Sequence, residues 1–132
     1  MKKTLWGLAF FLGTSLALAE PIHQEIQAFI QQYFPSEQVT EYKFMPQKEY
    51  ERYKIELTNE VEITFNPAFK PTEIESEYLG VPLEALPNRV ADYLTTNYPG
   101  DKVKEWDTER SRQEVKLMNG QKLYFDLEGN LL

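Results

Sequence analysis

Few residues of this chain have the types and spacing that catalysis requires. His23 is the only histidine and there is no cysteine, so a metal site or a general base would lack its partners. A Ser-His-Asp triad would have to use Ser36, Ser76 or Ser111, none of which lies in a nucleophile elbow. The sequence also has no phosphate loop and no dinucleotide-binding fingerprint. We therefore predict that the protein is not an enzyme, has no catalytic or metal-binding residues and needs no cofactor.

Two acidic stretches could bind a cation or a basic partner. Residues 126–130, "DLEGN", place oxygen atoms at alternate positions but lack the EF-hand spacing and its terminal glutamate. A hairpin turn explains the same residues, and we favour that interpretation. Residues 73–78, "EIESEY", place three glutamates on one face of a strand. They form either an acidic recognition edge or, as we prefer, charges that keep an edge strand from pairing.

The first residues have the pattern of a secretory signal peptide. Two lysines precede an apolar run over residues 5–18, and small residues end a cleavage motif at residue 19. The run is too short for an uncleaved membrane anchor, which needs about 20 apolar residues. We predict a signal peptide at residues 1–19 and a periplasmic or secreted protein with no membrane insertion after cleavage.

The composition after the signal peptide limits the partners. Residues 20–132 include 12 basic and 21 acidic residues, a net charge of −9. Nucleic acid and anionic lipid need clustered lysine and arginine, so both are poor partners for this chain. Because there is no cysteine, the core depends on apolar burial without disulfides, for which about 110 residues suffice. We expect one soluble, monomeric domain.

The chain repeats one unit. "IQAFIQQYFPSEQVTEY" (26–42) aligns with "VADYLTTNYPGDKVKEW" (90–106) at an offset of 64, and the apolar positions stay in step. "YKIELTNEVEITFN" then aligns with "QEVKLMNGQKLYFD" at an offset of 60. The first copy therefore has four extra residues, in the region of 46–52.

Each copy is predicted to begin with a helix and to continue with strands. Apolar stripes at three- and four-residue spacing mark the helices, at Ile22, Ile26, Phe29, Ile30 and Tyr33 and at Leu83, Leu86, Val90, Tyr93 and Leu94. Pro35 and Pro99 follow the helix ends, and Pro87 moves the second start toward Glu84 or Leu86. Alternating apolar residues mark strands, with inward positions at Tyr53, Ile55, Leu57, Val61, Ile63, Phe65, Val115, Leu117, Leu123 and Phe125.

The turns differ between the copies. Asn119-Gly120 predicts a two-residue hairpin turn, since both residues tolerate positive φ. The first copy has Glu60 in place of Gly120 and Phe69 in place of Gly129. A residue other than glycine at such a position costs up to about 1 kcal/mol. Because prolines flank Phe69, we expect a changed connection there.

One helix with three to four strands makes half a core, with a sheet too narrow to stand alone. Two copies, about residues 21–80 and 81–132, predict an α+β fold in which both helices pack on one face of one continuous antiparallel sheet. Tyr42 and Trp106 hold equivalent positions in the first strands. We interpret them as core anchors under the helices rather than as exposed stacking groups.

The motifs of this chain resemble a known family. "FIQQYFPSEQV" followed by "YKIELTNEVEITF", then "YLTTNYPGDKV" followed by "EVKLMNGQKLYFDLEGNLL", is similar to the PepSY-like exported proteins over about residues 22–132. The resemblance implies an architecture similar to β-lactamase inhibitory protein, a tandem αβ repeat that binds its target on the sheet face away from the helices. Related PepSY domains are often thought to restrain proteases. A fold does not carry a function, so the resemblance suggests a binding module but no contact residue.

The sheet face away from the helices is the first candidate binding surface, because Met118 and Tyr124 interrupt an otherwise polar face. The second is the loop "FMPQKEYERY", which only the first copy has. The candidate binding residues are Thr64, Lys116, Met118, Lys122 and Tyr124 on the face and Tyr50 and Arg52 in the loop.

We expect an exported, non-enzymatic binding protein that inhibits or modulates a protein partner of the cell envelope, such as a hydrolase. The alternative is a carrier or sensor of a small ligand, which would require a deep apolar pocket.

Overall fold

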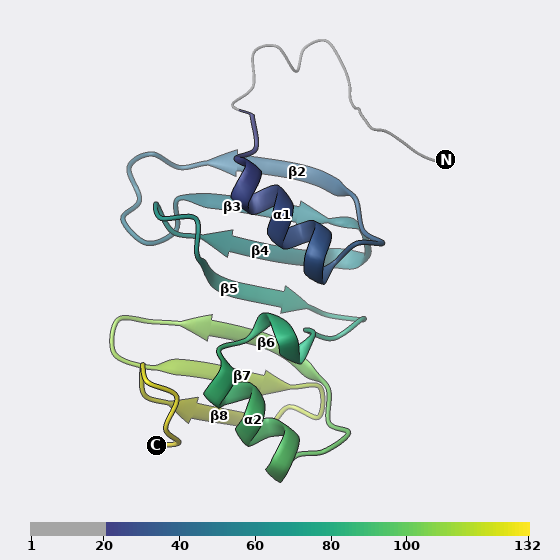
Figure 1. Ribbon diagram of the computed structural model, residues 1–132, viewed down its shortest axis with the longest axis vertical. Coiled ribbons are helices and arrows are strands. Elements are labelled where there is room, and N and C mark those ends of the chain that lie inside the picture. The colour runs from purple at the N-terminus through teal and green to yellow at the C-terminus, as the bar shows by residue number, and fades with distance from the viewer. Residues whose placement is uncertain (1–20) are drawn as a thin grey trace.

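A computed structural model describes residues 21–132, so the predicted signal peptide lies outside the described part. Seven strands form one antiparallel sheet in sequence order: β2 (Val39–Phe44), β3 (Tyr53–Leu57), β4 (Val61–Phe65), β5 (Pro71–Ser76), β6 (Val103–Thr108), β7 (Gln113–Leu117) and β8 (Lys122–Phe125). The helices α1 (Gln24–Tyr33) and α2 (Asn88–Asn97) lie on the same face of this sheet (Figure 1). The predicted α+β architecture is confirmed. Neither helix within residues 21–132 is long and apolar enough to cross a bilayer.

The histidine has a structural role at the start of α1. The Nδ1 atom of His23 accepts a hydrogen bond from the backbone N–H of Glu25 at 3.2 Å, as an N-cap residue does. Its ring stacks on Phe69 with a centroid distance of 3.7 Å. His23 therefore joins the start of the helix to the turn after β4.

The second helix begins later than predicted. A short 3-10 turn, Leu83–Ala85, comes first, and α2 starts only at Asn88. Pro87 separates the two, because a proline ring favours the first turn of a helix and disrupts its interior. The buried stripe of α2 is thus reduced to Val90 and Leu94.

A continuous row of side chains crosses the sheet on its helix-covered face. Its members are successive register partners on the seven strands: Tyr42, Ile55, Ile63, Ile74, Trp106, Val115 and Leu123. Trp106 is 4% exposed, and its Nε1–H donates to Oε1 of Gln113 at 2.8 Å. The core assignment of Trp106 is confirmed. Tyr42, at the edge of the sheet, is half-buried and packs against the same core.

The β3–β4 and β7–β8 turns differ in an unexpected way. The β7–β8 turn has a positive φ only at Gly120, and the Leu117 N–H donates to the Gln121 carbonyl at 2.8 Å. It is therefore a three-residue loop with glycine in the left-handed region, and the predicted two-residue turn is wrong. The β3–β4 turn instead has positive φ at both Asn59 (59°) and Glu60 (57°).

The second pair of turns has the same shape in both copies, so the predicted changed connection is wrong. Phe69 has φ of 64° where Gly129 has φ of 96°. Asn66 Oδ1 accepts the N–H groups of residues 68 and 70, and Asp126 Oδ1 accepts those of residues 128 and 130. Phe69 also stacks on His23 and Tyr53. These contacts offer a physical reason for a large residue in a left-handed position.

β5 is a central strand, with β4 on one side and β6 on the other. The interpretation of residues 73–78 as an edge strand is therefore wrong. Three register pairs join β5 to β6: Glu73 with Asp107, Ile74 with Trp106 and Glu75 with Glu105. This junction connects the two repeats within one sheet.

Candidate binding face

Within residues 21–132 both α-helices lie on one face of the sheet (Figure 1), and we call the opposite face the outer face. Two rows of register partners lie on it. They are Glu41, Glu56, Glu62, Glu75, Glu105, Lys116 and Lys122, and Lys43, Lys54, Thr64, Glu73, Asp107, Glu114 and Tyr124. Eight carboxylates thus share these rows with four lysines, and the outer face is acidic.

Lysines pair with carboxylates on either side of the central junction. Lys54 Nζ lies 3.1 Å from Oε2 of Glu62, and Lys116 Nζ lies 3.8 Å from Oε1 of Glu105. Lys122 Nζ lies 3.8 Å from Oε2 of Glu114. Partly exposed pairs of this kind contribute about 0–1 kcal/mol each, so they neutralise charge more than they add stability.

The carboxylates at the β5–β6 junction are in a different environment. Within residues 21–132, no lysine or arginine nitrogen lies within 4.0 Å of Glu73, Glu75 or Asp107. Burial raises the pKa of Glu73 to about 8, helped by a hydrogen bond with Glu105 and by the charge of Asp107. Burial also raises the pKa of Asp107 to about 6 and moves the pKa of Glu75 upward. Glu73 therefore holds a proton at neutral pH, whereas Asp107, with a pKa of about 6, is largely ionised there.

Two loops from different repeats meet beside this junction. The β2–β3 and β6–β7 connections leave the same end of the sheet, on the left in Figure 1. The guanidinium carbon of Arg110 lies 5.4 Å from the ring centroid of Tyr50, within cation–π range. The charge of Glu51 is also close enough to add to the raised pKa of Asp107, after burial and nearer carboxylates. The extra residues of the first repeat thus reach the second repeat.

The predicted residues on β7 and β8 do not form one apolar centre. Tyr124 pairs with Glu114, and the guanidinium carbon of Arg112 lies 4.4 Å from its ring centroid. Met118 lies in the turn at the opposite end of the hairpin, where its N–H donates to the Lys102 carbonyl at 2.9 Å. Tyr124 therefore lies on the outer face, and Met118 lies apart from it in the β7–β8 turn.

The remaining predicted residues contribute unequally to the surface. Lys116 and Lys122 lie on the outer face in the ion pairs given above. Thr64 lies in the row between Lys54 and Glu73 but is only 3% exposed. In the β2–β3 loop, Tyr50 is 48% exposed. The loop's Arg52 donates from Nε to the Lys48 carbonyl at 2.9 Å and thereby braces the loop itself.

Sequence reasoning missed the acidic centre of the face. The sequence pattern predicts an edge strand for Glu73 and Glu75 and does not single out Glu105 or Asp107. Alternating acids in "EIES" and "KEWD" were the available signal. Recognising a shared cluster required knowledge that these two strands pair.

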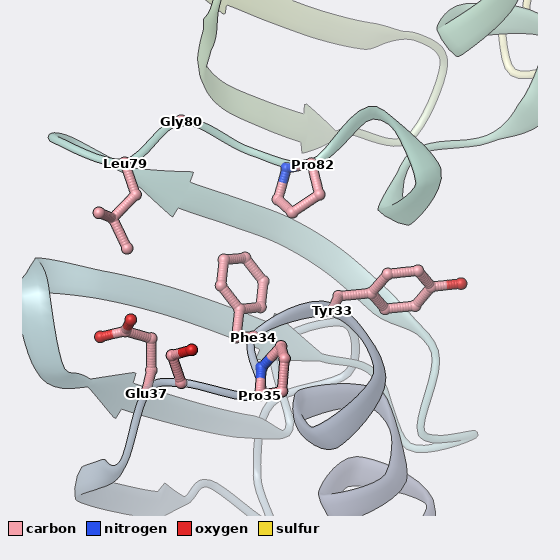
Figure 2. Close-up of a pocket in the computed structure, with 8 residues that line it drawn as sticks. Tyr33, Phe34, Pro35, Glu37, Leu79, Gly80 and Pro82 are labelled. Atoms are coloured by element: carbon pink, nitrogen blue, oxygen red, sulfur yellow. The ribbon is translucent and has the colours of Figure 1, made fainter.

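Two open hollows occur in the described part of the molecule. One, of about 240 Å³, lies between the end of α1 and the β5–α2 connection; Figure 2 shows Phe34 between Leu79 and Pro82, with Tyr33 directed to the side. The other, of about 500 Å³, lies at the β3–β4 turn end of the outer face and is lined largely by glutamates, among them Glu56, Glu62 and Glu75. Neither hollow is the deep apolar pocket that a small-ligand carrier would require.

Comparison with known proteins gives a consistent result. A family model described as "Putative beta-lactamase-inhibitor-like, PepSY-like" matches residues 18–70 and 51–132. The search of curated proteins gave no significant match.

Solved structures from Bacteroides have the same fold. A protein of Bacteroides thetaiotaomicron, provisionally described as calcium-regulated and periplasmic, is 33% identical, with a TM-score of 0.73 over 83% of this chain and 86% of its own. A periplasmic protein of Bacteroides vulgatus is 29% identical, with a TM-score of 0.74 over 86% of this chain and 93% of its own. A second protein from that species is 24% identical, with a TM-score of 0.68 over 83% and 87% of the two chains, and supports the fold alone. The predicted periplasmic or secreted location agrees with these descriptions. Because the family model matches more than half of the chain, the chain belongs to the PepSY-like, beta-lactamase-inhibitor-like family.

Proposed function

We propose that this protein is a non-enzymatic periplasmic binding protein that uses its outer face to bind a protein with a basic surface. The observation that carries the proposal is the β5–β6 junction, where Glu73, Glu75 and Asp107 face outward with no cation within ion-pair distance in the described residues. Complementary potentials guide partners together and select against wrong ones. Lysine or arginine side chains of a partner would relieve the repulsion at this junction.

The loops at one end of the outer face add specificity to this proposal. Tyr50 is exposed and lies beside Arg110, so an aromatic ring and a guanidinium border the acidic floor. Tyrosine and arginine are enriched among the residues that dominate binding energy. The partner would thus contact the acidic junction and the two loops together.

The family suggests what binding achieves. Its description names a likeness to beta-lactamase inhibitors, so inhibition of an exported hydrolase is the outcome that we propose. One relative is described as calcium-regulated. Carboxylate oxygens suit calcium, and calcium is therefore a variable in the experiment below.

The test is affinity capture with charge-reversed faces. The exported protein, recovered from the periplasm of an expression host, is immobilised and exposed to an envelope extract with calcium or with a chelator. Glu73→Lys with Glu75→Lys reverses the junction and places each new lysine opposite a carboxylate, so folding should be retained. Glu25→Lys with Asp92→Lys makes the same charge change on exposed helix positions.

A basic protein retained by the wild type and by the helix variant, but lost with the junction variant, would support the proposal. Its activity, if it is a hydrolase, should fall when the wild-type chain is added and not when the junction variant is added. Equal retention by all three forms would place binding elsewhere and contradict the proposal.

A further inference from the structure

The two repeats carry opposite charges at equivalent positions of the outer face. β3 and β4 correspond to β7 and β8 at an offset of 60. Glu56 on β3 therefore corresponds to Lys116 on β7, and Glu62 on β4 corresponds to Lys122 on β8. Both pairs of register partners belong to the same row across the sheet. This row changes sign between the first repeat and the second.

Two neighbouring positions follow the same rule. Glu60, in the β3–β4 turn, corresponds to Gly120 in the β7–β8 turn. Thr40, at the register irregularity of β2, corresponds to Lys104 at the irregularity of β6. Four equivalent positions thus hold three carboxylates and no cation in the first repeat, and three lysines and no carboxylate in the second.

The acidic end of this row is also concave. The hollow of about 500 Å³ at the β3–β4 turn is lined by five glutamates: Glu56, Glu60, Glu62, Glu75 and Glu77. Lys54 Nζ pairs with Glu62 at 3.1 Å, and Lys104 Nζ pairs with Glu77 at 3.7 Å. Within residues 21–132, the other three glutamates have no lysine or arginine nitrogen within 4.0 Å. The hollow therefore has room for a side chain of a partner, and its charge selects a basic one.

The lysines of the second repeat reach the surface. The side chains of Lys104, Lys116 and Lys122 are 33%, 32% and 50% exposed. Each nitrogen lies 3.7 Å or 3.8 Å from one carboxylate oxygen of the same chain. Partly exposed pairs of this kind contribute about 0–1 kcal/mol, so a carboxylate of a partner replaces one of them at little cost.

The two ends of the row are far enough apart to act separately. Because the strands lie in sequence order, β7 is four strands from β3, and β8 is four strands from β4 (Figure 1). At about 4.8 Å per strand, equivalent residues are about 19 Å apart. This separation exceeds the Debye length of about 8 Å at physiological ionic strength. A partner therefore meets two patches of opposite sign and not one averaged charge.

We infer that the outer face binds its protein partner in one orientation. Lysine or arginine side chains of the partner enter the acidic hollow of the first repeat, and carboxylates about 19 Å away pair with Lys116 and Lys122 of the second. The inference rests on the proposed function, which assigns binding to this face, and adds the polarity of the partner. A partner turned end for end would place like charges together at both ends, and a uniformly basic one would be repelled at the second repeat. The partner surface is therefore bipolar.

Two helical peptides of identical composition test the inference. Both contain equal numbers of lysines, glutamates and alanines. In the segregated peptide the glutamates occupy the N-terminal end and the lysines the C-terminal end, with about 13 residues between the two centres, since a helix rises about 1.5 Å per residue. In the mixed peptide the two charges alternate. Fluorescence anisotropy at low salt should show that the exported protein binds the segregated peptide about tenfold or more tightly than the mixed one.

Charge exchange supplies the matched variants. Glu56→Lys with Glu62→Lys gives lysines to both ends of the row, and Lys116→Glu with Lys122→Glu gives glutamates to both ends, so each pair should remove the preference. The four substitutions together restore a bipolar row in the reverse direction, and the preference should return. A nitroxide at the lysine end of the segregated peptide should broaden the amide NMR signals of β3 and β4 in the wild type. In the fourfold variant it should broaden those of β7 and β8.

Circular dichroism confirms that each variant is folded. Equal affinity of the wild type for the two peptides, or no binding of either up to about 1 mM, would overturn the inference. So would a nitroxide effect that stays on β3 and β4 in the fourfold variant.

The capture experiment separates these failures from a failure of the proposed function. A protein lost with the junction variant, but retained in full by Lys116→Glu with Lys122→Glu, would support the proposed function and overturn the inferred orientation. A protein retained equally by the junction variant would contradict the proposed function and, with it, this inference.

Discussion

Glu73 on β5 and Asp107 on β6 lie directly opposite each other at the junction of the two repeats. Glu75 and Glu105 form a second pair of carboxylates two residues along, so two of the three register pairs at this junction are acidic. Like charges in directly opposed positions destabilise a sheet. The pair therefore links the stability of the molecule to pH and to the proposed binding of a basic partner.

Stability should decrease from about pH 5 to about pH 9. The folded-state pKa of Glu73 is raised to about 8 from 4.5, mainly by burial, and that of Asp107 to about 6 from 3.8. A raised carboxyl pKa means that the folded state binds the proton more tightly than the unfolded state does. The resulting stabilisation is complete below the unfolded-state pKa and is lost as pH rises through the folded-state pKa. Urea unfolding at several pH values measures this trend.

Glu73→Gln should flatten that pH profile. The variant should gain about 1 kcal/mol relative to wild type at about pH 9 and little at about pH 5, because it removes a repulsive cross-strand charge. Asp92→Asn, on the exposed side of α2, is the matched control and should leave the profile unchanged. An unaltered profile in Glu73→Gln would show that the junction does not titrate as described.

Gln113→Leu should destabilise the fold by about 1–3 kcal/mol, because a buried donor loses its acceptor. The donor is Nε1–H of Trp106, 2.8 Å from the Gln113 oxygen. The amide nitrogen of Gln113 also donates to the Asp126 carbonyl at 3.0 Å, which would lose that partner. Thermal unfolding measures the loss. Gln121→Leu, at an exposed amide that donates to the Tyr98 hydroxyl, should change stability by less than about 0.5 kcal/mol; equal effects would contradict the prediction.

Glu60→Gly should stabilise the protein by up to about 1 kcal/mol. Glu60 has a φ of 57°, which glycine adopts without the steric cost that a Cβ introduces. Glu60→Ala is the control, because alanine keeps the Cβ and should give no comparable gain. Chemical unfolding midpoints compare the three proteins, and equal gains in both variants would indicate that removal of charge, not backbone strain, is responsible.

Alanine should be tolerated better at Gly120 than at Gly129. Both have positive φ, 93° and 96°, so both substitutions cost about 1–2 kcal/mol of backbone strain. A Cβ at Gly129 would also lie 2.6 Å from Cβ of Arg89, whereas nothing lies within 4 Å of one at Gly120. The clash should add about 1–3 kcal/mol at Gly129. Equal losses in thermal unfolding would show that α2 moves aside.

Local patterns in the sequence predicted the elements and their inner faces. A period of 3.6 or of two places side chains on one face through the geometry of the chain itself. Ile26 and Val90 on the helices and Ile55 and Val115 on the strands are therefore buried as expected. Offsets of 64 and 60 also revealed the repeat, which largely determines a single sheet with both helices on one face.

The candidate site was predicted only in part, because a local pattern assigns a side chain to a face of the sheet but does not specify the groups around it. Alternation placed Lys116, Lys122 and Tyr124 on the outer face, and the extra residues of the first copy indicated the loop that contains Tyr50. The groups that surround each of these side chains, such as Arg112 at Tyr124 and Arg110 at Tyr50, come from other elements. A local pattern does not specify them.

Only the tertiary structure decided which strands meet. The pairing of β5 with β6 brings Glu73 to Asp107, residues that are far apart in the chain and have no shared local signal. The turn at Phe69 keeps a glycine-like φ while its ring stacks on His23, a contact from a different element. Strand order and ring packing depend on non-local contacts, whereas periodicity depends on neighbours along the chain. The fold could therefore be predicted from the sequence, but the acidic centre of its outer face could not.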